Sequence, residues 1–313
     1  MLGRNLRPRR SCLSVPSNSP KMLAKAATLP ADQVLLDLED AVPSSEKSAA
    51  RPLIVEGLRT HDFGGKIVSL RVNAVETPWC YRDVIEVVEA AGGHLHTLVV
   101  PKVDGPGEVQ FVDRLLSQIE LAQGREVGRI GLEAQIESAA GVQQVDEIAK
   151  ASPRLEALIF GPGDLSADLG LPQLIIGKVV GDYPGDLWHY VSMRILLAAR
   201  ANHLLAIDGP YAVLADTEGL ERSARLSASL GFDGKWVVHP GQIETVNRVF
   251  TPDPRVYRRA EAIVAAYRQA TEQQGRGAVR YEGEMIDEAT RRMAEAIARR
   301  GRWLGLGSEK GRP

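Results

Sequence analysis

Residues 129–165 read RIGLEAQIESAAGVQQVDEIAKASPRLEALIFGPGDL, and the topology of the chain is inferred first from this segment. A short apolar run stands at each end, and a stretch of helical period lies between them. The first run leads into Glu137 and the second into Asp164. Strands joined by a helix run parallel, so their carboxyl ends lie at the same rim. We therefore expect Glu137 and Asp164 to lie side by side.

Two carboxylates at one rim suit a magnesium ion. Mg²⁺ takes one or two protein carboxylates and fills its remaining positions with water and substrate oxygens. Mn²⁺ is the alternative metal. Each residue also has a purely structural interpretation, because Glu137 could cap the following helix and Asp164 could end its strand in a turn.

The same alternation of apolar runs and helical stretches continues along the chain, which predicts a parallel sheet. Eight strands each followed by a helix are typical of a (β/α)8 TIM barrel, an α/β fold, and a doubly wound open sheet is the alternative. We place the barrel in residues 1–250. The predicted strands are Ser11 to Val15, Gln33 to Leu38, Lys66 to Val72, Thr97 to Val103, Ile130 to Ile136, Ala157 to Phe160, Leu204 to Ile207 and Lys235 to Val238.

The pattern after Pro240 changes to helices alone. We predict a C-terminal helical extension and lid in residues 251–313, with helices at 253–274 and 288–300 and a mobile segment from Gly275 onward. Its last residues, 305–313, are expected to be disordered. The segment after Gly277 has too little apolar sequence for a core of its own, so it must dock on another surface.

Composition excludes several classes of protein. The 313 residues are 44% apolar and carry 38 Lys and Arg against 40 Asp and Glu, which indicates a globular chain without the basic surface of a nucleic-acid-binding protein. The longest apolar runs are far shorter than the roughly 20 residues of a membrane span. The N-terminus lacks the apolar core of a secretory signal, so we expect a cytoplasmic protein. Cys12 and Cys80 have no metal-like spacing and are expected to be buried and reduced.

Polar residues cluster where the predicted strands end, which in this fold is where active sites form. So many carboxylates around a single arginine, Arg71, would repel one another unless a cation lies among them. Arg71 would then face an anionic, oxygen-rich ligand, or else only form an ion pair with Asp37 or Glu39. These strand ends are 37–40, 71–73, 101–102, 208–210 and 239–240.

The chain resembles the HpcH/HpaI aldolase and citrate lyase β-subunit-like family over nearly its whole length. The resemblance implies a TIM barrel, Glu137 and Asp164 as Mg²⁺ ligands, contact of Arg71 with the reacting carbonyl, and a homotrimer or homohexamer. The segments that carry it are 10–16, 36–42, 71–73, 101–102, 136–141, 160–165, 206–210 and 231–240.

Segments 71–79, 101–106, 111–113, 151–154 and 186–190 are similar to the L-malyl-CoA/β-methylmalyl-CoA lyase branch of that family. Citrate lyase β-subunits are a poorer match. Residues 283–287 are similar to a segment of acyl-CoA lyases whose Asp reaches the site of a neighbouring subunit as an acid or base, which here implies Asp287 as catalytic. A helix N-cap explains Asp287 equally well locally. Glu284 stands where the family often has Lys, and Ser138 where a Thr is common.

The expected reaction is a reversible Claisen cleavage of malyl-CoA or methylmalyl-CoA to glyoxylate and acetyl-CoA or propionyl-CoA. The partners are thus an acyl-CoA thioester and a 2-oxoacid. A malyl-CoA thioesterase, a citramalyl-CoA or citryl-CoA lyase and a non-enzymatic binding protein are the alternatives.

The CoA and substrate contacts are the least constrained part of the sequence. Basic side chains near the first strand could meet CoA phosphates, or could lie on a solvated helix face. Trp79 could line the acyl pocket or pack in the hydrophobic core. We place at this site Arg10, Lys21, Lys25, Glu39, Asp40, Asn73, Trp79 and Pro210.

Overall fold

A computed structural model describes residues 7–177, 184–274 and 277–307. Eight parallel strands close into a barrel in chain order, with each strand paired to the next and β8 paired to β1. The predicted TIM barrel is confirmed, and the open sheet is wrong. The strands are β1 Ser11–Pro16, β2 Gln33–Asp37, β3 Ile67–Arg71, β4 Thr97–Val100, β5 Gly131–Ile136, β6 Leu155–Phe160, β7 Leu205–Asp208 and β8 Gly234–Val237.

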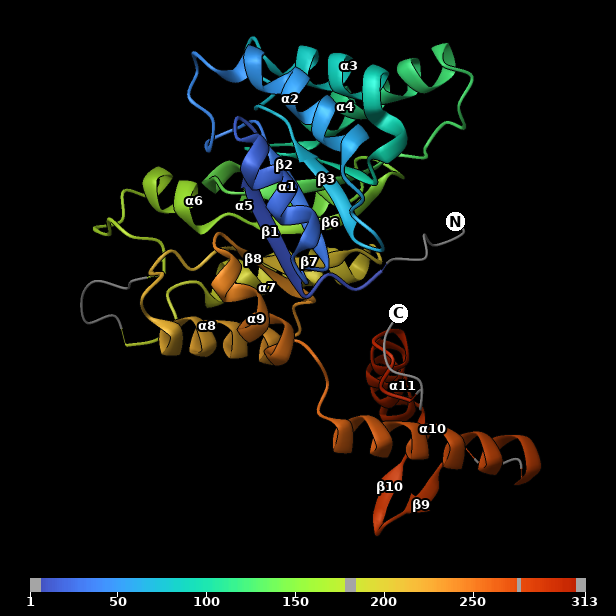
Figure 1. Ribbon diagram of the computed structural model, residues 1–313. Helices are drawn as coiled ribbons and strands as arrows, with labels where there is room; N and C mark the ends of the chain where they lie inside the picture. Colours follow the sequence, from blue (N-terminus) through green and yellow to red (C-terminus); the bar gives the residue numbers. More distant parts are fainter. Residues whose placement is uncertain (1–6, 178–183, 275–276, 308–313) are drawn as a thin grey trace. The chain divides into compact units, whose positions relative to one another are not determined.

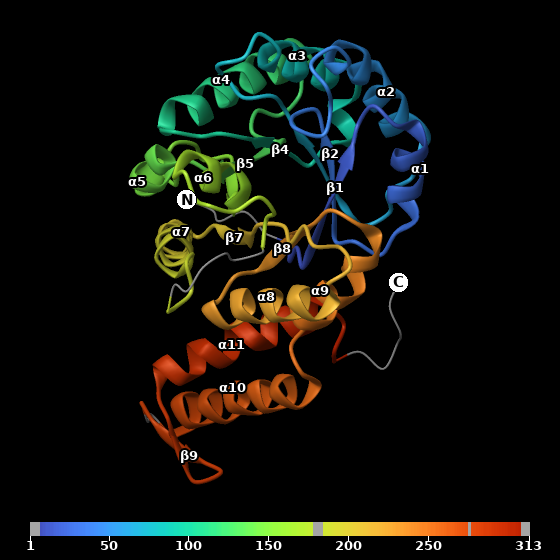
Figure 2. The same ribbon diagram turned by 90° about the vertical axis from the view of Figure 1, so that its left-hand side faces the viewer.

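Helices surround these strands (Figures 1 and 2). Every residue of β2, β3, β4, β5 and β8 is buried, because helices cover the outer face of the strands while side chains fill the interior. The helices are α1 Pro20–Thr28, α2 Lys47–Thr60, α3 Cys80–Ala91, α4 Pro106–Ala122, α5 Ala139–Ile148, α6 Pro162–Asp168, α7 His189–Ala201, α8 Thr217–Leu230 and α9 Ile243–Val249, with short 3₁₀ turns at η1 Gly92–His94 and η2 Pro240–Gln242.

The barrel interior is polar near the beginnings of the strands. The buried carboxylate of Glu133 accepts hydrogen bonds from Gln33 at 2.7 Å, Thr97 at 2.5 Å and Ser69 at 3.2 Å, and it forms an ion pair with Arg9 at 2.7 Å. A buried charge is tolerated only when it is paired and hydrogen-bonded in this way. This network therefore joins β2, β3, β4 and β5 to the segment before β1.

An apolar layer lies within the same barrel and helps to close its interior. Its members come from six of the eight strands, so none of these six can leave the barrel without exposing part of this layer. They are Cys12, Leu35, Val99, Ala157, Ile159, Ile207 and Trp236.

The chain divides into two compact units, residues 1–247 and 248–313. The second unit contains α10 Pro254–Gln274, β9 Val279–Tyr281, β10 Glu284–Ile286 and α11 Glu288–Trp303. Strands β9 and β10 form an antiparallel hairpin, so the expectation of helices alone after Pro240 is wrong. The turn residues Glu282 and Gly283 have φ of 48° and 89°, the left-handed backbone that a two-residue hairpin turn requires.

The segment after Gly277 docks on α10 of its own chain. A small core joins α10, the hairpin and α11, so a neighbouring subunit is not needed to cover this segment's apolar residues. The buried members are Ala260, Ile263, Val264, Tyr267, Ile286, Ala294 and Ala298. Disorder was predicted for residues 305–313, but residues 305–307 form a turn in which the Gly305 N–H donates to the Arg302 carbonyl at 3.0 Å. Residues 308–313 lie outside the described residues.

No helix in the described ranges is long and apolar enough to cross a membrane. Cys12 and Cys80 are free and buried.

Candidate active site

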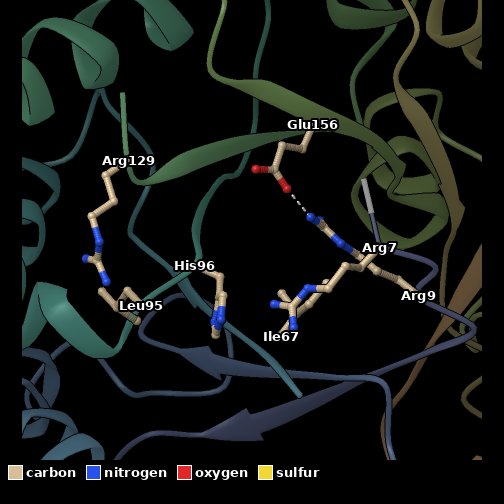
Figure 3. A pocket seen from close by; sticks show the side chains of 7 residues that line it. All are labelled: Arg7, Arg9, Ile67, Leu95, His96, Arg129 and Glu156. Carbon is tan, nitrogen blue, oxygen red and sulfur yellow. Dashed lines mark hydrogen bonds and ion pairs between the residues drawn. The ribbon is translucent and has the colours of Figure 1, made fainter. Parts of the chain in front are cut away.

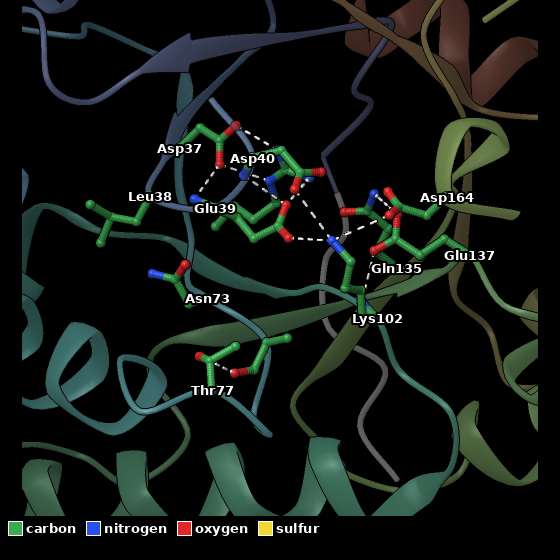
Figure 4. Close-up of polar contacts among 12 residues, drawn as sticks. Asp37, Leu38, Glu39, Asp40, Asn73, Thr77, Lys102, Gln135, Glu137 and Asp164 are labelled. Carbon is green, nitrogen blue, oxygen red and sulfur yellow. Dashed lines mark hydrogen bonds and ion pairs between the residues drawn. The ribbon is translucent and has the colours of Figure 1, made fainter. Parts of the chain in front are cut away.

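Glu137 and Asp164 meet at the carboxyl ends of β5 and β6 (Figure 4). Glu137 follows β5 directly and is buried, while Asp164 lies in the first turn of α6 with its side chain 38% exposed. Ser138, not Glu137, caps α5, since its hydroxyl accepts from the Gly141 N–H at 3.0 Å. Asp164 likewise stands inside a helix rather than in a turn. The two structural interpretations of these carboxylates are therefore wrong.

The Glu137 carboxylate is held at both oxygens. The Lys102 N–H donates to Oε1 at 2.8 Å and the Gln135 amide to Oε2 at 2.5 Å. A Cβ on Gly161 would lie 2.4 Å from Glu137 Cβ and 2.5 Å from Oε2, so only glycine leaves room for this side chain. The orientation of Glu137 is thus fixed by β5, β6 and the end of β4.

The donor set at this rim fits a hard cation. Burial and the neighbouring Asp164 carboxylate raise the pKa of Glu137 to about 8, against the opposing effects of the Arg71 charge and the Lys102 N–H. The buried Gln135 Oε1 has no hydrogen-bond donor among the described residues. Within those residues no group of three or more His, Cys, Asp or Glu side chains could hold a metal, so a cation here would take two carboxylates and complete its shell with water and ligand oxygens.

Arg71, the last residue of β3, is buried in the same rim. Its Nε and Nη2 donate to the two oxygens of Asp37 at 2.8 and 2.5 Å, and its Nη1 lies 3.0 Å from Glu39. The guanidinium also stacks on Trp236, 5.2 Å from the ring centroid. The ion pair expected as the structural alternative is present, and it fixes the direction in which the Arg71 fork points.

Lys102, which follows β4 as the sequence predicted, brings a second cation to this rim beside Arg71. Its ammonium contacts Glu39 and lies 3.3 Å from both Asp40 and Asp164 (Figure 4). Partial burial opposes its charge, but the hydrogen bond and charge of Glu39 raise the pKa of Lys102 above its usual value. A φ of 49° turns the Lys102 backbone so that its N–H reaches Glu137.

Asn73 and Trp79 border the rim on the β3 side. The Asn73 amide donates to the buried carboxylate of Asp83 at 2.6 Å, and Asp83 also accepts from Arg51 at 2.7 Å. Trp79 is half-buried under the Lys47 ammonium, which lies 5.4 Å from the ring centroid. The Asn73 side chain is therefore committed to holding α3 and the loop before it.

The remaining predicted contacts are scattered. Arg10 precedes β1, at the end of the barrel away from Glu137, and its buried guanidinium is paired with Asp32 at 2.7 Å, so the expected contact with a CoA phosphate does not fit. Lys21 and Lys25 are exposed on α1, and Pro210 is half-buried just after β7.

Asp287 belongs to the second unit and caps α11. Its exposed carboxylate accepts from the Thr290 N–H at 2.8 Å. Glu284, which stands where the resembled family often has Lys, pairs with Arg259 at 2.7 Å.

Residues 10–240 match the family described as HpcH/HpaI aldolase/citrate lyase. The chain belongs to this family. It is 40% identical over 302 residues to an L-malyl-CoA/β-methylmalyl-CoA lyase of Cereibacter sphaeroides, covering 94% of each chain, and 36% identical to a citrate lyase β-subunit of Leuconostoc mesenteroides, covering 90% of each. The solved structure of CitE from Mycobacterium tuberculosis in complex with magnesium, acetoacetate and coenzyme A is 30% identical, with a TM-score of 0.71 over 95% of this chain and 99% of that one.

The structure brings together Glu137, Asp164, Arg71, Glu39 and Asp40, as the strand ends predicted. It adds three residues that the sequence did not single out as site residues, namely Lys102, Gln135 and Trp236. The sequence did offer a signal for Gln135, because Gln135 stands two residues before Glu137 at the end of a predicted strand, where alternate residues share a face.

Proposed function

We propose that this protein catalyses reversible carbon–carbon cleavage of a 3-hydroxyacyl-CoA thioester of the malyl-CoA or methylmalyl-CoA type. The products would be glyoxylate and acetyl-CoA or propionyl-CoA. The observation that carries the proposal is the pair Glu137 and Asp164 beside the buried Arg71 fork at one barrel rim. Membership of the family and the 40% identical lyase support the same chemistry.

Glu137 and Asp164 would hold Mg²⁺ or Mn²⁺. A bound divalent cation polarises carboxylate, hydroxyl and carbonyl oxygens of its ligand without a proton transfer. Gln135 and the Lys102 N–H keep the Glu137 oxygens in place, which pre-organises this half of the site.

The bond cleavage is a retro-Claisen step. A base takes the proton of the substrate hydroxyl, the bond between the hydroxyl-bearing carbon and its neighbour breaks, and the electron pair moves into the thioester as an enolate. The aldehyde carbon leaves as the 2-oxoacid, and a proton added to the enolate carbon completes the acyl-CoA. Arg71, aimed by Asp37 and Glu39, would stabilise the oxygen charge that develops in this step.

Asp287 is our candidate for the proton-transfer group, supplied by a homotrimer or homohexamer to the site of a neighbouring subunit. Its exposed carboxylate on an N-cap leaves it accessible to another chain. Lys21 and Lys25 are the candidates for the CoA phosphates, while Glu39, Asp40, Asn73, Trp79 and Pro210 border the acyl and 2-oxoacid ligand. Asn73 and Trp79 would act there mainly by shaping the wall, since their polar and aromatic contacts are with Asp83 and Lys47.

The decisive experiment follows malyl-CoA turnover with Mg²⁺ while detecting glyoxylate, acetyl-CoA, malate and free CoA separately. Glyoxylate and acetyl-CoA in equal amounts support the lyase. Malate and free CoA without glyoxylate would show a thioesterase instead. No turnover of malyl-CoA, methylmalyl-CoA, citramalyl-CoA or citryl-CoA would reject the proposal, provided that the protein is folded.

A further inference from the structure

A polar cavity lies at the end of the barrel opposite the rim of Glu137 and Asp164. It has a volume of about 260 Å³. Its lining residues precede strands or begin them: Ile67 is the first residue of β3 and His96 stands just before β4. Parallel strands all begin at the end opposite their carboxyl termini, so this cavity is distinct from the rim that carries Glu137 and Asp164. The lining consists of Arg7, Arg9, Ile67, Leu95, His96, Arg129 and Glu156 (Figure 3).

Arg9 forms ion pairs with two nearby carboxylates, those of Glu133 and Glu156. It is almost fully buried, its Nη1 lies 2.7 Å from Glu133, and its Nη2 donates to Glu156. Glu133 and Glu156 are therefore both in contact with Arg9. The charge of Glu156 also acts on Arg7, whereas Arg129 donates to carbonyl oxygens within the described residues.

Arg7 and Arg129 contact only carbonyl oxygens within the described part of the chain. Arg7 donates to the Gly65 carbonyl at 3.2 Å, and Arg129 donates to Gly92 at 3.1 Å and to Gly93 at 2.8 Å. These bonds anchor each guanidinium and leave further N–H groups of each fork unused, because a guanidinium has five. The result is two fixed cations at one cavity.

His96 adds a third donor. Its Nδ1 accepts from the Val68 N–H at 3.0 Å, so the proton of the neutral ring is on Nε2. In Figure 3 its ring lies between the side chains of Arg7 and Arg129. Burial and the charges of Arg7, Arg9 and Arg129 lower the pKa of His96, while the charge of Glu156 opposes this shift.

We propose that this cavity is a binding site for a small phosphate-type dianion. Two guanidinium groups and an imidazole N–H reach the cavity from three different segments. Donors arranged in this way suit a compact tetrahedral oxyanion, whereas a single guanidinium is enough to bind a planar carboxylate. The volume has room for the ion and several waters, each of which takes about 30 Å³. The ion would join the segment before β1 to the loops before β4 and β5 and would stabilise the folded chain by mass action.

The test is a titration of the metal-free protein with inorganic phosphate, with chloride keeping the ionic strength constant. Calorimetry gives the dissociation constant, and proton NMR follows the His96 ring, assigned with His96→Gln. We expect Arg7→Gln and Arg129→Gln each to weaken phosphate binding by about tenfold or more, the loss of one charge-assisted fork. Arg59→Gln is the matched control, since Arg59 also donates to a carbonyl, that of Ala90 at 2.8 Å, but lies outside the cavity. It should bind phosphate as the parent does.

The His96 resonance of the unmodified protein provides a readout that does not depend on how a variant folds. Saturable movement of this resonance with phosphate, together with weaker binding by both cavity variants, supports the site. Equal dissociation constants in the parent, Arg7→Gln and Arg129→Gln would overturn it, as would a His96 resonance that does not respond. Binding of malonate but not of phosphate would overturn the assignment to a phosphate-type ion. The lyase proposal is tested independently of these outcomes.

Discussion

Gly161→Ala tests whether the position of Glu137 is essential, without changing any charge. The added Cβ would lie 2.4 Å from Glu137 Cβ, whereas carbon atoms pack at about 3.5–4.0 Å, so Glu137 must recede by about 1 Å. The Gly161 φ of −107° suits any residue, which leaves this contact as the cause of the effect. A displacement of this size in a catalytic group costs about a hundredfold in turnover, and overpacking costs about 1–3 kcal/mol of stability.

The assay is the initial rate of malyl-CoA cleavage as a function of Mg²⁺ concentration, with thermal unfolding measured in parallel. We expect a lower maximal rate and a higher half-saturating Mg²⁺ concentration in a folded protein. Gly107→Ala is the control, because nothing lies within 4 Å of its added Cβ, and it should retain parental kinetics. Parental kinetics and Mg²⁺ dependence in Gly161→Ala would refute the view that the Glu137 orientation limits the reaction.

Four further predictions use the same preparations. Asp164→Ala should reduce activity to background and abolish calorimetric Mg²⁺ binding while the circular dichroism spectrum stays unchanged; full activity of this variant in chelator would remove the metal from the reaction. Arg71→Lys should lower turnover by about a hundredfold because a point charge cannot replace a fork aimed at the developing oxyanion, and parental turnover would leave Arg71 an ion-pair residue only. Asp287→Asn mixed with Arg71→Ala should regain activity that neither variant has alone, if subunits share sites; an inactive mixture after verified exchange would place Asp287 outside the reaction or in its own chain's site. Glu120→Gln should cost about 3 kcal/mol of unfolding free energy at neutral pH, because it breaks a buried pair at 2.6 Å from Arg154.

The Glu120 prediction includes a pH dependence. Burial opposes ionisation, but hydrogen bonds from Arg154 and from two backbone N–H groups lower the pKa of Glu120 below its usual value. The unfolded chain then binds the proton more readily, so this contribution is complete above the unfolded pKa of about 4.3 and is lost as pH falls through the folded value. Chemical denaturation of the parent and of Glu120→Gln should therefore show a difference that shrinks only below about pH 4.3. A difference that grows on acidification would contradict the sign.

The strands and the central carboxylates could be predicted because their signals are local. Apolar runs such as that of β5 mark buried strands, and parallel order alone places Glu137 and Asp164 at one rim. The arginine fork is different. Arg71 was located at the correct strand end, yet its contacts with both Asp37 and Glu39 depend on how β2 and β3 lie in register.

Lys102 shows what the sequence could not supply. Its place after β4 was evident, but the left-handed backbone that turns its N–H to Glu137 and its ammonium into the carboxylates is a property of the closed rim. Arg10 failed for a related reason, since a basic residue beside a strand can lie at either end of it. The β9 and β10 hairpin, by contrast, had a local signal in Gly283, since glycine readily takes the left-handed backbone of a two-residue hairpin turn.

The β5 strand bears on how this protein can change in evolution or by design. Glu133, Gln135 and Glu137 occupy every second position, so one short strand supplies both the interior ion-pair network and the carboxylate at the rim. Insertion or deletion of one residue between Glu133 and Glu137 would turn the side chains on one side of the change from the lumen to the helix layer, so the three could no longer share one face. Changes in chain length are thus expected in the loop of residues 123–130 that precedes β5, and not within the strand. The polar groups at the two ends of the barrel therefore depend on the length of the same strand.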